Sequence, residues 1–400
     1  MKNGQLPLSG IRVLDLTQVA AGPFCSMLLA DFGAEVIKIE IPKQGDALRK
    51  WGPPFIGGES VYFLGLNRNK KSMTLNLKSE KGREIFLELV KRSDVIIENF
   101  RPGTMEKLGL TYELLKSINP KIVYARISGY GQIGPYSKRG GYDLLIQGES
   151  GLISVTGEAD RPPGAKVGVA IVDFGAGMYA AIGILLALLH RQRTGKGQII
   201  DIALFDTAIS WMLQPIGSYL ATGKVPERSG TIHPVAAPYQ AFKTKDDVYI
   251  TIGCAVDEHW RKLCEILGVK ELAEDPRFAT NPKRVENREE LTKKLSRIFL
   301  TRSRAEWLKI LSEAEIPCAP VNTVDKVVND AQVLYRQMLV EIDHPTAGKI
   351  KVTGIPVKLS EVTTQKMTPP PLLGQHTKEI LHELGYGDED IRKLEEEGVI

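Results

Sequence analysis

The chain has 400 residues, 43% of them hydrophobic and 25% charged, which excludes a disordered chain and provides enough length for two domains. Its 52 basic and 48 acidic residues give a net charge of +4 without a clustered stripe of Lys and Arg, which excludes a nucleic-acid binder but allows a local pocket for a small anion. Four cysteines without a Cys-x-x-Cys pair, and a longest apolar run of only 178–189, predict a cytoplasmic protein with no membrane anchor.

Short β-branched runs alternate with amphipathic segments from residue 10 onward, a pattern typical of βα units that build a parallel sheet. One helix is expected over 23–32 and another from Ser79, which is a good N-cap. A long loop rich in Pro and Gly, 157–168, leads into a strand-like run at 169–172 and then a helix that ends near Arg193, before Gly195. The expected strands of the sheet are 11–16, 35–41, 71–77, 94–98, 122–127 and 199–204.

The character of the sequence changes after residue 222. Residues 239–254 alternate around a polar turn and predict a hairpin, and the segment that follows, to about 320, is charged and helical. We therefore expect an α/β protein with a large parallel-sheet domain over 1–222 and a smaller α+β domain over 223–329. The segment 330–400, which ends in an amphipathic helix, is expected to return and pack on the large domain.

Residues 175–180 formally match the dinucleotide fingerprint G-x-G-x-x-G/A. The match lacks the acidic residue expected about twenty positions later, and the carboxylate of Asp173 would repel a pyrophosphate. Asp173 can be interpreted as a helix N-cap or as a reactive carboxylate. The bare backbone of Gly175 and Gly177 favours the second interpretation, because it suits close substrate approach and amide donors for an oxyanion.

The histidines show no zinc spacing and no G-x-S-x-G serine is present, so no metal site is predicted. Asn99, Phe100 and Arg101 follow an apolar strand, and they place an amide, a ring and a cation where open α/β sheets bind ligands. The alternative for this motif is a loop with a solvated arginine.

With Asp173, the motif 99–103 and Gly129-Tyr130-Gly131 in view, the chain resembles the class III CoA-transferases, the group that includes formyl-CoA transferase and the carnitine CoA-transferases. The likeness runs nearly from end to end, through separated motifs in the same order. These motifs lie at 8–17, 21–23, 28–40, 67–72, 142–143, 173–177, 193–198 and 371–377.

The resemblance implies a Rossmann-like large domain, a smaller domain and an interlocked, ring-like homodimer. It also implies acyl-CoA as a substrate, with no tightly bound cofactor. By position, the residues implied to contact CoA are Val19 and Ala20 on the adenosine-to-pantetheine path, Leu75 and Lys78 at the nucleotide, Asn99, Phe100 and Arg101 near the pantetheine, Lys107 and Arg139 at phosphates, and Tyr142 in the acyl pocket. The chain departs from formyl-CoA transferase at Ile41, where that enzyme has a cation, and at Ala20, where it has an active-site amide. The glycine-rich flap of that enzyme also has no counterpart here, which argues against formate and oxalate as substrates.

The activity that the resemblance implies is transfer of CoA from an acyl-CoA to a carboxylic acid. Asp173 would form a mixed anhydride and then an aspartyl-CoA thioester, with succinyl-CoA suggested as donor. One alternative is a related α-methylacyl-CoA racemase, which pairs an aspartate with a histidine. Tyr142 stands at that histidine's position, and a phenol with a pKa near 10 is a poor proton-exchange partner near neutrality. Another alternative is an acyl-CoA-binding partner subunit in a hetero-oligomer.

Overall fold

The computed structural model describes residues 6–362 and 367–400, and it divides into two compact units. The first unit comprises the described residues of Met1–Leu152, Val167–Gly217 and Leu334–Ile400, and the second comprises Ile153–Lys166 and Ser218–Val333. The segment Ile153–Lys166 therefore groups with the second unit, whereas the sequence analysis assigned it to the large domain.

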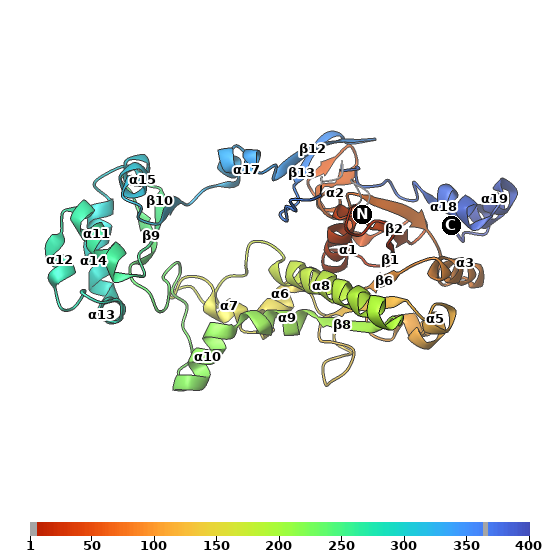
Figure 1. The fold of residues 1–400 in the computed structure, drawn as a ribbon, viewed down its shortest axis with the longest axis horizontal. Helices are drawn as coiled ribbons and strands as arrows, with labels where there is room; N and C mark the ends of the chain where they lie inside the picture. The colour runs from red at the N-terminus through yellow and green to blue at the C-terminus, as the bar shows by residue number, and fades with distance from the viewer. Residues whose placement is uncertain (1–5, 363–366) are drawn as a thin grey trace. The chain divides into compact units, whose positions relative to one another are not determined.

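The first unit is built on a six-stranded parallel sheet with strand order β5-β2-β1-β6-β7-β8 (Figure 1). The order runs outward in both directions from β1 and β6, which is the Rossmann arrangement and puts a switch point between these two strands. All six predicted strands are confirmed, and no end is shifted by more than three residues. The strands are β1 (Arg12–Asp15), β2 (Glu35–Glu40), β5 (Lys70–Thr74), β6 (Val95–Glu98), β7 (Val123–Ser128) and β8 (Ile199–Ala203).

Helices cover both faces of this sheet, because side chains alternate along each strand. Val13 of β1 packs in one core with α1 and α8, and Leu14 packs in another with α3, α5, α18 and α19. Ser79 caps α3, as predicted. The helices of this unit are α1 (Ala21–Asp31), α2 (Val61–Leu66), α3 (Glu80–Lys91), α4 (Thr104–Lys107), α5 (Tyr112–Ile118), α6 (Asp143–Glu149), α8 (Ile171–Thr194), α9 (Leu204–Trp211), α18 (Thr377–Leu384) and α19 (Asp388–Glu396).

Three small pieces complete the first unit, and its C-terminal segment runs back along the sheet. The amide of His376 donates to the carbonyl of Ser72, and the amide of Asn76 donates to the carbonyl of Val399. The small pieces are a 3₁₀ turn (Ala47–Lys50), the strand pair β3 (Phe55–Ile56) and β4 (Glu59–Ser60), and the hairpin β12 (Leu339–His344) and β13 (Gly348–Thr353).

The second unit has its own aromatic core, which includes Trp260, Phe242 and Phe299. The predicted hairpin is confirmed as an antiparallel pair, and a third short strand joins it. The elements are β9 (Tyr239–Lys243), β10 (Tyr249–Gly253), β11 (Cys318–Pro320), α11 (Asp257–Leu267), α12 (Lys270–Glu274), α13 (Asn281–Glu286), α14 (Arg288–Phe299), α15 (Arg304–Glu313) and α16 (Val324–Val327). The chain passes between the units at α7 (Leu152–Val155), α10 (Leu213–Thr222) and α17 (Ala331–Tyr335).

Helix α8 packs closely against α1, and glycines make this possible. A β-carbon on Gly177 would lie 2.6 Å from the carbonyl oxygen of Ala21, and one on Gly175 would lie 1.9 Å from the ring of Trp211. Both glycines are buried inside α8, so their amides belong to the helix hydrogen-bond ladder. The prediction that they supply oxyanion donors is wrong, and so is the dinucleotide fingerprint, because these residues lie within a helix and not in a strand-to-helix turn.

The expected strand at 169–172 is also wrong, because α8 already begins at Ile171. The helix has 24 residues, and its most apolar 18-residue window has a mean hydropathy of 1.9, so by length and composition it could cross a membrane. The apolar run judged too short in the sequence is therefore part of a longer helix. Half of that window is buried, and α8 packs against α1, α9 and the sheet, as a core helix does. One such helix is weak evidence for a membrane span.

Candidate active site

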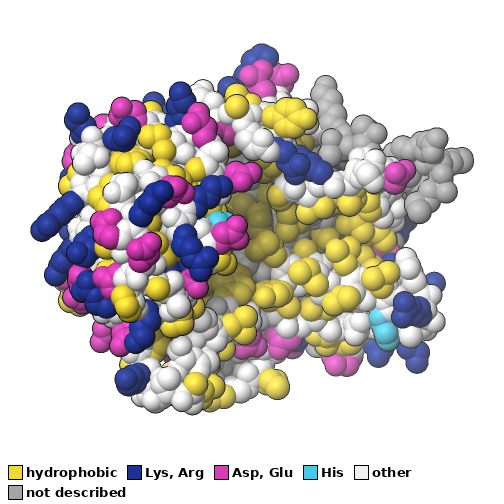
Figure 2. Space-filling model, turned by 60° about the vertical axis from the view of Figure 1, so that its left-hand side comes forward, with side chains coloured by type: hydrophobic (Ala, Val, Ile, Leu, Met, Phe, Trp, Pro, Cys, Tyr) yellow, Lys and Arg dark blue, Asp and Glu magenta, His cyan; other side chains and the backbone are white. Residues whose placement is uncertain are grey.

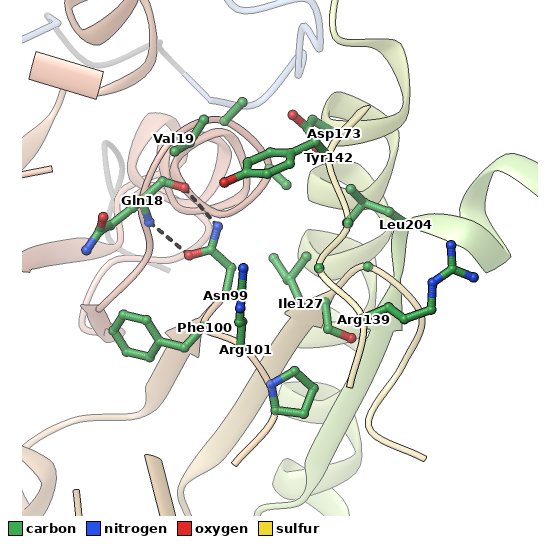
Figure 3. A pocket seen from close by; sticks show the side chains of 17 residues that line it. Gln18, Val19, Asn99, Phe100, Arg101, Ile127, Arg139, Tyr142, Asp173 and Leu204 are labelled. Carbon is green, nitrogen blue, oxygen red and sulfur yellow. Dashed lines mark hydrogen bonds between the residues drawn. The ribbon is translucent and has the colours of Figure 1, made fainter. Parts of the chain in front are cut away.

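A pocket of roughly 240 Å³ opens at the carboxyl ends of β1, β6 and β7, where the strand order switches direction (Figure 3). Its walls come from the segments that follow these three strands, from the loop before α6, and from the first turns of α8 and α9. The lining residues are Gln18, Val19, Ala20, Ala21, Asn99, Phe100, Arg101, Pro102, Ile127, Ser128, Gly129, Arg139, Gly140, Gly141, Tyr142, Asp173 and Leu204. The pocket lies entirely within the first unit.

Asn99 joins two walls of the pocket through its carboxamide. Its Oδ1 accepts the amide of Gln18 at 2.9 Å, and its Nδ2 donates to the carbonyl of Gln18 at 2.8 Å (Figure 3). The end of β6 is fixed as well, because the amide of Phe100 donates to the buried carboxylate of Glu98 at 2.7 Å. Residues 99–102 of the predicted motif are therefore part of the pocket wall, and its asparagine holds the backbone of Gln18 in place.

Asp173 lies in the first turn of α8 and is half-buried. Burial, together with the nearby negative charge of Asp143, raises the pKa of the Asp173 carboxyl to about 7. Oδ1 of Asp143 accepts the amide of Val172 at 2.8 Å and so satisfies the start of the helix. The N-cap interpretation of Asp173 is wrong, because Asp143 does that work and leaves the Asp173 carboxylate facing the pocket.

Tyr142 and a pair of glycines shape the wall next to Asp173. Tyr142 is 62% exposed and lines the same pocket as Asp173 (Figure 3). The backbones of Gly129 and Gly141 approach so closely that a β-carbon on either would lie 2.7 Å or less from the other's Cα. Sequence reasoning did not assign Gly140 or Gly141 to the site. The Gly-Gly pair directly before Tyr142 was the signal that could have done so.

Of the four basic residues predicted to contact CoA, two line the pocket and two do not. Arg101 and Arg139 line the pocket, and Arg139 is already engaged, because it forms two hydrogen bonds with Glu149, at 2.7 and 3.0 Å, and lies over two tyrosine rings. Lys78 and Lys107 are exposed and lie outside the pocket lining.

Leu75, which the resemblance places at the nucleotide, does not line the pocket either. Its side chain is only 2% exposed because it packs in the core with α3 and the C-terminal helices. That side chain stabilises the fold, and a contact between this position and the nucleotide stays a prediction.

The site combines a half-buried carboxylate with a phenol, and no Lys or Arg among residues 6–362 and 367–400 forms an ion pair with Asp173. Within the same residues, no group of three His, Cys, Asp or Glu side chains could hold a metal ion. A carboxylate with a pKa near 7 is roughly half ionised at neutral pH, and its ionised form is more basic than an ordinary aspartate. Such a group can act as a nucleophile or as a base.

We predict that Asp173→Asn stabilises the protein at high pH. Because the pKa of Asp173 lies above its ordinary value of 3.8, the folded protein binds this proton more tightly than the unfolded chain, and stability is lost as pH rises from about 4 to about 7. Asn removes that loss, so its advantage in urea unfolding should grow from pH 5 to pH 8 and reach roughly 1–2 kcal/mol, limited by partial solvent exposure. Asp206→Asn, in the exposed first turn of α9, serves as control. A difference that does not change with pH would contradict the raised pKa.

Comparison with known proteins gives one consistent result. A family model described as CoA-transferase family III matches residues 8–377. The succinyl-CoA:glutarate CoA-transferase of Mus musculus is 46% identical over 98% of this chain and 90% of its own, and the succinate–glutarate CoA-transferase of Agrobacterium fabrum is 38% identical over 96% and 97%. A solved CAIB/BAIF family protein from Brucella suis is 42% identical, with a TM-score of 0.85 over 96% of this chain and 100% of that one.

These matches span both units and include every segment that lines the pocket. They agree with the resemblance noted in the sequence motifs, and they identify the acyl-CoA and carboxylate chemistry for which a reactive aspartate is suited. The chain belongs to family III of the CoA-transferases and is an acyl-CoA:carboxylate CoA-transferase.

Proposed function

We propose that Asp173 is the nucleophile that carries the acyl group during CoA transfer. The observation that carries this proposal is the position of its carboxylate, half-buried in a pocket at the sheet switch point and without a cationic partner in the described chain. A weak nucleophile needs desolvation and tight positioning, and burial in the first turn of a rigid helix supports both.

The proposed sequence exchanges one activated acyl bond for another. An Asp173 oxygen attacks the thioester carbonyl, the C–S bond breaks, and CoA leaves as a thiolate. The donor acyl group is then joined to Asp173 as a mixed anhydride. The thiolate attacks the aspartyl carbonyl, the anhydride C–O bond breaks, and the donor acid leaves. The acceptor carboxylate then attacks the aspartyl-CoA thioester, and the same two steps in reverse release the new acyl-CoA and free Asp173. No ATP is consumed because no acyl bond is hydrolysed.

We assign the hydroxyl of Tyr142 as a hydrogen-bond donor to the acyl carbonyl or to the substrate carboxylate. A phenol is suited to donate at neutral pH, and Tyr142 lines the pocket beside Asp173. The pocket is smaller than a site that encloses a drug-sized ligand, so it fits the reacting end of the thioester. The pantetheine would run past Asn99 and Phe100, along Val19 and Ala20, toward Arg101 and Arg139, while Lys78 and Lys107 would contact phosphate farther out.

Replacement of Asp173 tests the covalent step directly. We predict that Asp173→Ala and Asp173→Asn abolish CoA transfer, by a factor of about 10³ or more, while CoA binding persists, because the acyl carrier is removed. Hydroxylamine or borohydride added with succinyl-CoA should modify the peptide that contains Asp173 in the wild type, detected by mass spectrometry. Asp206→Asn should keep full activity. Labelling of another carboxylate, or a persistently active Asp173 variant, would overturn the assignment.

We propose succinyl-CoA as donor and a short dicarboxylate such as glutarate as acceptor. The support is that relatives of 46% and 38% identity are named for the transfer between succinyl-CoA or succinate and glutarate. Arg101 lines the pocket and has no ion pair within the described chain, so it is a cation available to a second carboxylate or to CoA.

A panel of acids incubated with succinyl-CoA and followed by mass spectrometry tests this choice. We expect glutarate to form its CoA ester at a rate at least tenfold above that of a monocarboxylate of equal length, because only the diacid can pair its far carboxylate with a cation. Equal rates for both acids would show that the second carboxylate is not recognised.

We propose that two copies of the chain form a homodimer, interlocked as the family resemblance implies. The exposed side of α8 supports association, because its apolar residues recur at helical spacing. They are Met178, Ile182, Leu185, Leu186 and Leu189, each at least 40% exposed. Figure 2 shows hydrophobic side chains gathered over a broad area of the surface.

Sedimentation of the purified chain tests the assembly. We predict a dimer that does not dissociate at micromolar concentration without loss of helical structure, since separation would expose a large apolar surface. Leu186→Glu should weaken it, and Glu313→Lys, on α15 of the second unit, is the charge-changing control. A stable folded monomer would contradict the homodimer, and activity that requires an added second subunit would favour a hetero-oligomer.

A further inference from the structure

Val19, on the wall of the pocket, has a backbone conformation that valine avoids. Its φ is +67°, and among the six non-glycine residues with positive φ in the described chain it is the β-branched one. A left-handed conformation is unfavourable for an ordinary L-residue, and for a β-branched residue it is a genuine outlier. Such strain persists only where the surroundings hold it in place.

Asp46 holds the amide of Val19. Its Oδ1 accepts that N–H at 3.0 Å, and its Oδ2 forms an ion pair with Nζ of Lys38 at 2.9 Å, with both side chains fully buried. Asp46 is held in turn, because its own amide donates to the carboxylate of Glu40 at 2.9 Å. The carboxylate that fixes Val19 is therefore itself fixed from two sides.

The residues on either side of Val19 are held in the same way. Nζ of Lys38 donates to the carbonyl of Thr17 at 2.7 Å, and the buried carboxylate of Asp15 accepts the amide of Thr17 at 2.9 Å. Lys70 neutralises Asp15 at 3.2 Å, so the four buried charges of this cluster balance. With Asn99 bonded to both backbone groups of Gln18, side chains from distant parts of the sequence fix the backbone from 17 to 19.

A purely structural role does not explain this arrangement well. Buried ion pairs seldom raise stability over apolar packing, because desolvation offsets their attraction. Another buried pair, in which Arg68 contacts Asp31 at 2.6 and 2.9 Å, has the carbonyl of Thr353 among its partners, and none of these residues lines the pocket. The Asp46–Lys38 pair differs because both of its members bond directly to the backbone of a segment that forms or adjoins the pocket wall.

We propose that Asp46 and Lys38 are positioning residues for coenzyme A: they hold Val19 in its left-handed conformation and so keep the 17–20 segment ready to receive the cofactor portion of the substrate. A wall already fixed in the binding conformation spares the entropy of ordering it at each binding event. The inference rests on the proposed function, since it takes this pocket as the CoA site.

The test is a double-mutant cycle read as the dissociation constant of CoA, by calorimetry, on the full chain. In the protein with the native Val19, Asp46→Ala should weaken CoA binding roughly tenfold, because the hydrogen bond that holds Val19 at positive φ is then lost. In the Val19→Gly background the same change should cost about twofold or less, because glycine adopts positive φ freely. Asp31→Ala, which leaves Arg68 equally unpaired, should keep CoA binding within about twofold of wild type.

Asp46→Asn provides a second variant if the alanine variant does not fold. It keeps an oxygen acceptor for Val19 but removes the ion pair with Lys38, so we expect about a threefold loss in the Val19 background and none in the glycine background. Equal losses in both backgrounds, or an equal loss from Asp31→Ala, would overturn the positioning role. A wild-type chain that does not bind CoA would instead refute the proposed function, which separates the two failures.

Discussion

The close packing of α8 on α1 is the constraint that places the carboxylate of Asp173 in the pocket wall. Because Gly177 has no side chain, the α8 backbone approaches Ala21, and Asp173 lies four residues earlier in the same helix. Helix α1 itself begins directly after Val19 and Ala20, so the helix contact sets the distance between the carboxylate and the opposite pocket wall. A β-carbon at Gly177 would force the helices apart, and a displacement of about 1 Å is enough to impair a positioned nucleophile.

Buried carboxylates are paired with lysines on one side of the pocket and unpaired on the other. Under Val19, the carboxylates of Asp15 and Asp46 each meet a lysine. On the α8 side, burial raises the pKa of Asp173, and the negative charge of another carboxylate, Asp143, raises that pKa further. The paired charges keep the backbone still, whereas the unpaired one stays at a higher free energy in its ionised form. In the proposed reaction, attack of Asp173 on a thioester removes that unfavourable charge.

Sequence patterns predicted the sheet well because most of its strands, such as 95–98 and 123–128, are β-branched and apolar runs bounded by polar turns. The place of Asp173 in the pocket wall could also be predicted, since an aspartate next to small residues in an otherwise apolar segment is unusual, and its role as nucleophile stays a proposal. The wrong role assigned to Gly175 and the unforeseen burial of Leu75 share a physical cause. Gly175 is small because Trp211 approaches from α9, and Leu75 is apolar because C-terminal helices cover it. Neither partner is near in sequence, so local pattern could not separate packing from ligand contact.

The same limit explains why Asp46 was not predicted. In the sequence it follows Gly45 in a polar loop and has the appearance of a solvated turn residue. Its task arises only when β2 brings Lys38 beneath the loop that follows β1 and makes the carboxylate a bridge between two segments. A side chain that fixes the backbone of another segment leaves a weak signal in the sequence, because it looks like any other polar loop residue. An unfavourable φ at a β-branched residue on a pocket wall locates such a side chain, because the strain requires a nearby group that opposes it.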